Sequence, residues 1–422
     1  MTRRELLLLV PLLALYLGAW AFFPDRPDDE ASYVALAERL ADGWYVTGDD
    51  DALLDARPDS PDLWFGPGLP GILAPLALVD APVWAMRLTG PLLLFGGVLM
   101  FYALARATWG SRVGLVSAYA LGLYLPFLGL VSNLHSEALA VFFVCAAMLG
   151  LARYLRSAGL WWLALASGAL AGLSLTRVAY GWVLTLVLVL FLVAWLVRRR
   201  RVDGRVAAVV GIALILCLPW LAYTYAKTDR VFVWGNSGSL SLYWMASPYE
   251  GDQGDWHQAH LVFSDPALEP HRAFFASLRG RPLAEQNAEI EREALRNIAD
   301  HPDAYVENVL ANLSRMLVNA PYSRVDWQWN DLFYAVPNVL LLAVAVFAAV
   351  VLVLRRRTLP PETSAFAVFA AVAFGLHALV ASYPRMLAPI VPLVVWLATL
   401  AFVDSGALTR ARRDRPPPTE SA

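Results

Sequence analysis

Long apolar stretches recur along the whole chain of 422 residues, and they restrict its fold more than any other feature. A helix of about 18–20 apolar residues crosses the hydrocarbon core of a bilayer, where every backbone N–H and C=O must be paired within the protein. Only 16% of the residues are charged, against about 25% in soluble domains. We therefore predict an all-α polytopic membrane protein with about ten transmembrane helices. The predicted spans are 6–23, 83–105, 112–131, 137–155, 159–176, 178–197, 206–226, 336–354, 364–381 and 386–403.

Two segments of the N-terminal part differ from ordinary internal spans. Residues 6–23 follow Arg3 and Arg4 and resemble a signal peptide, but the apolar run exceeds the usual core of about 7–15 residues. We therefore expect an uncleaved first span. Segment 64–80 is rich in proline and glycine and is too broken for a span, so we expect a re-entrant or interfacial piece.

Arginines cluster at alternate ends of the predicted spans. Because positively charged loops stay in the cytoplasm, this alternation predicts that both termini are cytoplasmic. We expect a multi-pass protein of the plasma (inner) membrane, with its active site on the extracytoplasmic side. The clusters are Arg3 and Arg4, Arg106 and Arg112, Arg153 and Arg156, Arg198 to Arg201 with Arg205, Arg355 to Arg357, and Arg410 to Arg415.

This topology divides the chain into four parts. Apolar residues recur at helical spacing over 284–301 and 303–319, which predicts two short amphipathic helices lying on the membrane or against the bundle. The parts are a seven-span N-terminal membrane module 1–226 with an acidic first outer loop 24–82, an extracytoplasmic loop domain 227–335, a three-span C-terminal membrane module 336–404, and a disordered cytoplasmic tail 405–422.

The first outer loop contains the acidic run Asp28-Asp29-Glu30. Asp29 and Tyr33 are one helical turn apart, so both side chains face the same way. A carboxylate here is a candidate general base for an acceptor hydroxyl. Helix initiation is an equally good interpretation, because Pro27 followed by acidic residues suits a first turn.

Polar residues also mark the outer ends of later spans. His135 and Glu137 open the fourth span, where Glu137 is either a substrate ligand or part of a capping arrangement. Arg177 lies in an outer turn, where arginine is disfavoured unless it meets a phosphate, a carboxylate or lipid headgroups.

The last outer turn contains Tyr383-Pro384-Arg385. Pro384 favours a helix start, and the free N–H groups of a helix N-terminus beside the Arg385 guanidinium would suit an anion. His377 is about two turns earlier and is more often a packing residue in such a context. An outer carboxylate and outer arginines are what glycosyl transfer from a lipid phosphate requires.

On these residues the chain resembles the GT-C superfamily of integral membrane glycosyltransferases, most of all the family 39 type that includes protein O-mannosyltransferases and aminoarabinose lipid A transferases. The similar segments occur in order along nearly the whole chain. They are Asp29 to Tyr33 with Leu36 to Gly43, Gly66 to Pro70, Ser136-Glu137, Leu175 to Arg177, Glu293 to Leu295 with His301-Pro302, and Tyr383 to Pro389.

The resemblance implies an inverting transfer from a polyprenyl-phosphate sugar, with Asp29 as base and Asp28 as the rival assignment. The phosphate would lie near Arg385 and Arg177. The other residues expected to bind substrate are Asp28, Glu30, Tyr33, His135, Glu137 and Tyr383. Some relatives have a further soluble domain after the last span, whereas here a short tail follows it. We therefore expect the outer loops to recognise the acceptor, which is a glycan, lipid or protein. Aromatic side chains that could stack on sugars are Tyr33, Trp64, Trp234, Tyr243 and Trp244, although an interfacial aromatic belt explains most such residues.

Two other functions remain open. An O-antigen ligase or polymerase also uses lipid-linked sugars, but its outer loops favour arginine, whereas the first loop here is acidic. A transporter would need polar residues at mid-span and broken helices in paired halves. No motif indicates a particular cofactor, and a divalent metal is compatible with Asp28, Asp29 and Glu137 although no spacing demands one. The net charge of −2 gives no indication of nucleic-acid binding.

Overall fold

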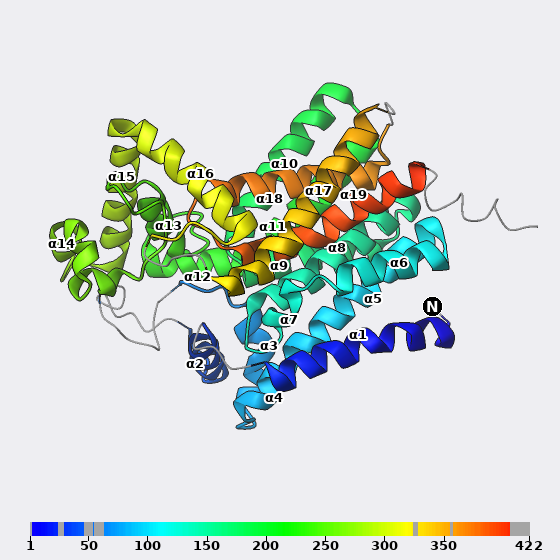
Figure 1. The fold of residues 1–422 in the computed structure, drawn as a ribbon, viewed down its shortest axis with the longest axis horizontal. Helices are drawn as coiled ribbons and strands as arrows, with labels where there is room; N and C mark the ends of the chain where they lie inside the picture. Colours follow the sequence, from blue (N-terminus) through cyan, green and yellow to red (C-terminus); the bar gives the residue numbers. More distant parts are fainter. Residues whose placement is uncertain are drawn as a thin grey trace, which may run out of the picture.

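The computed structural model describes residues 2–23, 29–45, 54, 63–323, 328–354 and 358–405. Within these ranges the chain is helical and contains no strand (Figure 1). The all-α prediction is therefore confirmed.

In the described part of the chain, six helical stretches are long and apolar enough to cross a membrane. A seventh exists if α11 (Arg201–Leu216) and α12 (Leu218–Thr228), which are bent by 46° relative to each other, count as one span. The polytopic membrane architecture is thus confirmed. The six are α1 (Arg3–Phe22), α4 (Val83–Arg87) with α5 (Thr89–Trp109), α8 (Ser136–Ser157), α10 (Ala179–Arg198), α17 (Leu332–Leu354), and η4 (Pro384–Ile390) with α19 (Val391–Asp404).

The other three predicted spans correspond to shorter or more polar helices. Segment 112–131 is split into α6 (Ser111–Gly122) and α7 (Pro126–Leu130), and Pro126 has no backbone N–H to continue the hydrogen bonds of α6. Segment 159–176 forms α9 (Leu160–Thr176), and segment 364–381 forms α18 (Pro361–Ala378). The number of membrane crossings therefore remains a prediction. The broken segment 64–80 forms the short helix α3 (Gly68–Ala77).

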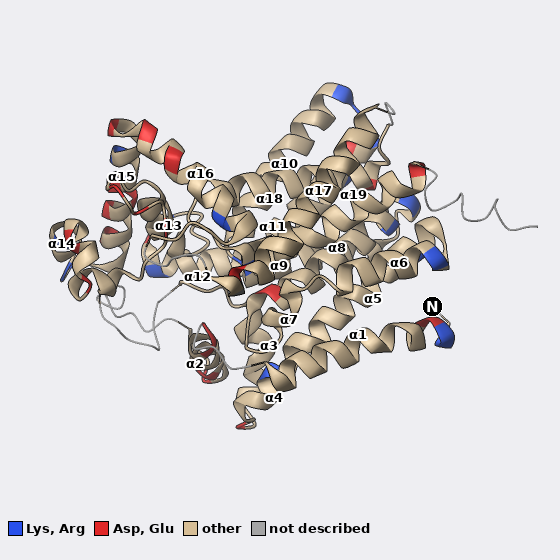
Figure 2. Cartoon of the chain, viewed as in Figure 1, with Lys and Arg blue, Asp and Glu red and all other residues tan. Residues whose placement is uncertain are grey.

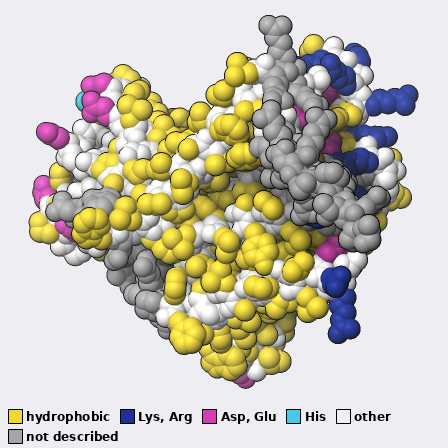
Figure 3. All heavy atoms as spheres, turned by 45° about the vertical axis from the view of Figure 1, so that its right-hand side comes forward, with side chains coloured by type: hydrophobic (Ala, Val, Ile, Leu, Met, Phe, Trp, Pro, Cys, Tyr) yellow, Lys and Arg dark blue, Asp and Glu magenta, His cyan; other side chains and the backbone are white. Residues whose placement is uncertain are grey.

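The surface of the bundle is apolar over a broad band (Figure 3). Side chains such as Leu7, Val193 and Leu340 are more than half exposed there, which suits contact with lipid tails. Arginines gather at one end of the bundle, at the start of α1 and the end of α10 (Figure 2). Acidic side chains are concentrated at the opposite end.

That opposite end holds a helical outer unit formed by α13 (Ser237–Met245), α14 (Glu269–Ala276), α15 (Leu283–Asp300) and α16 (Pro302–Val318). The predicted helices 284–301 and 303–319 are confirmed as α15 and α16. Tyr243 and Trp244 are 3% and 0% exposed in the core of this unit, so both serve packing and neither faces a ligand.

The helix α16 packs with its polar side toward the protein. Asn312 donates from Nδ2 to the backbone carbonyls of His377, Ala378 and Val380, at 2.9–3.1 Å. These bonds fix the outer unit on the end of α18. The apolar residue Leu310 on the opposite side is 61% exposed.

A buried polar network stabilises the outer unit. Tyr243 and the carboxylate of Asp252 contact opposite nitrogens of His271, at 2.7 and 2.9 Å. Burial alone would raise the pKa of Asp252, but hydrogen bonds from His271 and Ser247 outweigh that effect and hold it below its ordinary value.

Candidate functional site

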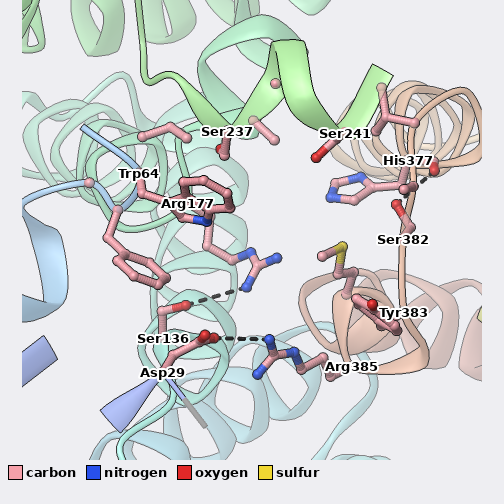
Figure 4. A pocket seen from close by; sticks show the side chains of 18 of the residues that line it. Asp29, Trp64, Ser136, Arg177, Ser237, Ser241, His377, Ser382, Tyr383 and Arg385 are labelled. Carbon is pink, nitrogen blue, oxygen red and sulfur yellow. Dashed lines mark hydrogen bonds and ion pairs between the residues drawn. The ribbon is translucent and has the colours of Figure 1, made fainter. Parts of the chain in front are cut away.

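A pocket of about 210 Å³ lies where the outer unit meets the end of the membrane bundle (Figure 4). Its walls come from α2 (Glu30–Ala41), the starts of α8 and α10, the end of α9, the helix α13 and the turn between α18 and η4. Five of the predicted site residues line it: Asp29, Tyr33, Arg177, Tyr383 and Arg385.

Four charged side chains of alternating sign form a chain along one wall of the pocket. Arg385 donates from Nη2 to Asp29 Oδ2 at 2.9 Å, and its Nε lies 3.6 Å from Glu137 Oε1. Arg177 donates from Nη1 to the same Glu137 oxygen at 2.7 Å and to Ser136 Oγ at 3.3 Å. Figure 4 shows both guanidinium groups directed into the pocket. The pocket therefore holds two cations whose charges are balanced by two carboxylates.

Glu137 lies behind this wall and bridges the two arginines. Its side chain is only 2% exposed, whereas those of Arg177, Arg385 and Asp29 are 14%, 21% and 30% exposed. A buried carboxylate is stable only when it is paired. Glu137 thus orients both guanidinium groups, and the more accessible Asp29 faces the pocket.

Asp29 is the N-cap residue of α2, but its carboxylate makes no capping hydrogen bond. Its position at the start of α2 agrees with helix initiation, while its ion pair with Arg385 places the carboxylate at the pocket. Tyr33, one turn later, is 3% exposed and packs on Phe65 with ring centroids 4.6 Å apart. Burial raises the pKa of Tyr33, and the nearby carboxylates of Asp29 and Glu137 raise it further, so the phenol stays protonated.

The proline- and glycine-rich segment positions Arg177. A Cβ on Gly66 would lie 2.0 Å from the Leu175 carbonyl oxygen, and one on Gly68 would lie 2.3 Å from Thr176 Oγ1. Both glycines are therefore needed for the close approach of this segment to the end of α9. Arg177 follows immediately after that end, which fixes its place in the pocket.

Glu30 and His135 are not among the residues that line the pocket. Glu30 makes a two-point ion pair with Arg87, at 2.7 and 2.8 Å, and accepts a bond from the Leu134 N–H. His135 is the buried N-cap residue of α8. Asp28 lies outside the described residues.

The sequence predicted that the outer loops recognise the acceptor, but it did not identify which residues of the outer unit line the pocket. Ser237, Gly238 and Ser241 line it from α13, and Trp256 lines it from the loop that follows. The only signal was a serine- and glycine-rich stretch at 235–241, which by itself is typical of a loop. His377, expected to be a packing residue, also lines the pocket.

No group of three or more His, Cys, Asp and Glu side chains within the described ranges is arranged to hold a metal ion. Asp29 and Glu137 each face arginine, which is a poor setting for a cation.

No family model and no curated protein sequence matches the chain. Among solved structures, it is similar to the archaeal oligosaccharyltransferase AglB from Archaeoglobus fulgidus in complex with an inhibitory peptide and a dolichol-phosphate. The TM-score is 0.54 at 13% identity, over 100% of this chain and 53% of that chain. A second structure of the Archaeoglobus fulgidus oligosaccharyltransferase, tethered to an acceptor peptide that contains the NVT sequon, gives a TM-score of 0.57 at 15% identity, over 96% of this chain and 50% of that chain.

ArnT from Cupriavidus metallidurans, bound to undecaprenyl phosphate, gives a lower TM-score of 0.42 at 16% identity, over 98% of this chain and 81% of that chain. The chain spans about half the length of the oligosaccharyltransferase chains that it matches. The chain shares the fold of the matched half of these oligosaccharyltransferase chains, which agrees with the expected resemblance at the level of the fold.

Proposed function

We propose that this chain is an integral membrane glycosyltransferase that moves a sugar from a polyprenyl-phosphate donor to an acceptor hydroxyl. The observation that most supports this function is the chain of Asp29, Arg385, Glu137 and Arg177 along a pocket at one end of a membrane bundle. It supplies a carboxylate for a hydroxyl and two cations for a phosphate. The fold shared with a protein that was solved with a dolichol-phosphate is consistent with a lipid-linked donor.

In the proposed reaction, the acceptor oxygen attacks the anomeric carbon of the donor from the face opposite the phosphate. The new C–O bond forms as the bond from the anomeric carbon to the phosphate oxygen breaks, so the configuration inverts. Asp29 takes the proton of the attacking hydroxyl. The lipid phosphate leaves with the bonding electron pair, and the arginines stabilise its added negative charge.

The ion pair between Asp29 and Arg385 suggests how donor binding prepares the base. A phosphate that reaches Arg385 competes with the Asp29 carboxylate for the guanidinium group. When Asp29 loses that partner, its carboxylate becomes a stronger base. Glu137 keeps Arg177 and Arg385 in place because it is buried behind both.

We place the pocket on the extracytoplasmic side of the plasma membrane, with both termini in the cytoplasm. The arginines at the far end of the bundle support this orientation through the positive-inside rule (Figure 2).

The test is sugar transfer in proteoliposomes, with a panel of radiolabelled polyprenyl-phosphate sugars and membrane extract as the source of acceptor. We expect Asp29→Asn to lower the rate of transfer about 10²- to 10⁴-fold, the usual contribution of a general base. Asp28→Asn, which tests the rival assignment, should retain activity.

Asp42→Asn is a matched control, since Asp42 is an exposed carboxylate that caps the other end of α2 and does not line the pocket. Full activity of Asp29→Asn would refute the role of Asp29. A folded wild-type protein that neither transfers nor binds any lipid-linked sugar would refute the function itself, and transport would be measured next.

A further inference from the structure

A second cavity adjoins the pocket on the side away from Asp29. Its volume is about 410 Å³, within the range of roughly 300–1,000 Å³ typical of small-molecule sites. Six residues line both cavities, so the two cavities adjoin. They are Val178, Ala179, Ser237, Gly238, His377 and Val380. We call this cavity the second chamber.

The second chamber combines aromatic and amide side chains. Trp182, Phe232 and Trp234 form a series of edge-to-face contacts along it, with ring centroids 5.3 and 5.7 Å apart. Asn236 and Asn287 also line it. Aromatic faces pack against the C–H faces of a sugar ring, and amides exchange hydrogen bonds with its hydroxyl groups.

Two buried acceptors in the second chamber lack a hydrogen-bond partner in the protein. Asn236 Oδ1 has none, although the residue is only 7% exposed. His377 is 3% exposed, and its Nδ1 donates to the Ala373 carbonyl at 2.7 Å. That bond leaves the lone pair on Nε2, which also has no partner. Figure 4 shows the His377 ring extending from α18 into the pocket. Buried acceptors without donors are unfavourable, and a hydroxyl-bearing ligand would satisfy both.

The charges at the second chamber cancel each other. Arg230 and Glu291 are its only charged lining residues within the described part of the chain, and they pair with each other at 2.9 Å. Both side chains are 44% exposed, so the pair lies at the rim. A neutral ligand fits this setting better than an anionic one, because no cation is left unbalanced for it.

We propose that the second chamber binds the acceptor and that the acceptor is a neutral carbohydrate. Its ring packs along Trp182, which is 51% exposed, its hydroxyls donate to Asn236 and His377, and its reactive hydroxyl enters the pocket toward Asp29. The assignment of this carbohydrate as acceptor rests on the proposed function, whereas its binding does not.

Binding is measured first, by the change in intrinsic tryptophan fluorescence of the whole protein in lipid nanodiscs. The probes are neutral disaccharide methyl glycosides and, for comparison, a neutral peptide that contains serine and threonine. We expect saturable binding of at least one glycoside and none of the peptide. Asn236→Leu, which keeps the branched shape of the side chain, should weaken glycoside binding by about three- to tenfold, the effect of losing one hydrogen bond.

Stability separates a binding role from a structural one. Since Asn236 Oδ1 has no partner to lose, Asn236→Leu should leave the unfolding midpoint unchanged or raise it. Asn308→Leu is the matched contrast, because Asn308 donates to the carbonyls of Met245 and Ser247 and does not line either cavity. It should lower the midpoint and, while the protein is folded, keep glycoside binding.

Transfer is measured second, with the bound glycoside as acceptor. If Asn236→Leu weakens glycoside binding but the protein transfers sugar to no acceptor, the proposed function is refuted. The second chamber would then still be a carbohydrate-binding site. Unchanged glycoside affinity in Asn236→Leu, or binding of the peptide alone, would overturn the inference.

Discussion

The substitution Glu137→Gln tests whether the buried carboxylate holds the two arginines of the site. Glu137 accepts from Arg177 at 2.7 Å and lies 3.6 Å from Arg385 Nε, and its side chain is 2% exposed. Water and salt hardly screen this contact. Removing one partner of a buried ion pair costs about 3–5 kcal/mol, because the other charges stay buried and uncompensated. Glutamine keeps the shape of the side chain, so we expect a loss of free energy of unfolding near the lower end of that range.

The matched control is Glu362→Gln. Glu362 pairs with Arg156 at 2.6 Å, but that guanidinium is 41% exposed, and pairs open to solvent are worth about 0–1 kcal/mol. Unfolding by sodium dodecyl sulfate in mixed micelles, followed by circular dichroism, gives both free energies. Glu137→Gln should cost at least about 2 kcal/mol more than Glu362→Gln. Equal costs would refute the reasoning, and so would a double-mutant cycle without coupling between Glu137 and Arg177.

Three further predictions follow from the same geometry. Gly68→Ala places a Cβ 2.3 Å from Thr176 Oγ1, so it should lower the free energy of unfolding by about 1–3 kcal/mol and slow transfer. Gly71→Ala, whose Cβ has nothing nearer than 3.9 Å, should be neutral or stabilising. Unfolding midpoints and transfer rates test both variants. Arg385→Lys keeps the charge but lacks the planar group that presents Nη2 to Asp29 and Nε to Glu137, so kcat/KM should fall at least about tenfold. An unchanged kcat/KM would contradict the role of Arg385 in holding both carboxylates. The pKa of Asp252 is lowered in the folded protein, so this carboxylate stabilises the fold above its ordinary pKa of 3.8. That stabilisation is lost as the pH falls through the pKa of the folded state. Asp252→Asn should reduce this loss of stability in acid when the free energy of unfolding is measured against pH.

The helical membrane architecture was predictable from the sequence because its causes are local. Apolar runs of spanning length leave the backbone no partner except itself, which favours helices. The two outer helices were predicted within about a residue, as 284–301 and 303–319 against Leu283–Asp300 and Pro302–Val318. Their apolar spacing and the proline between them are features of neighbouring residues.

The sequence was less informative where a helix end depends on its surroundings. Residues 112–131 are apolar enough for one span, yet the helix stops at Gly122 and resumes at Pro126. In α16 the apolar spacing was recognised, but Asn312 faces the protein and Leu310 faces outward. Periodicity identifies an amphipathic face without identifying what covers it.

For the site, the sequence by itself identified the four charged residues that meet at one end of the bundle: Asp29, Glu137, Arg177 and Arg385. Only the tertiary structure decided how they pair. Arg385 meets Asp29 across 356 positions of the chain, and both arginines meet one buried glutamate. Pairing at such separations depends on how the helices pack against one another, and no local pattern of residues encodes that packing. The second chamber has the same origin, since it exists only where the outer unit is fixed against α10 and α18.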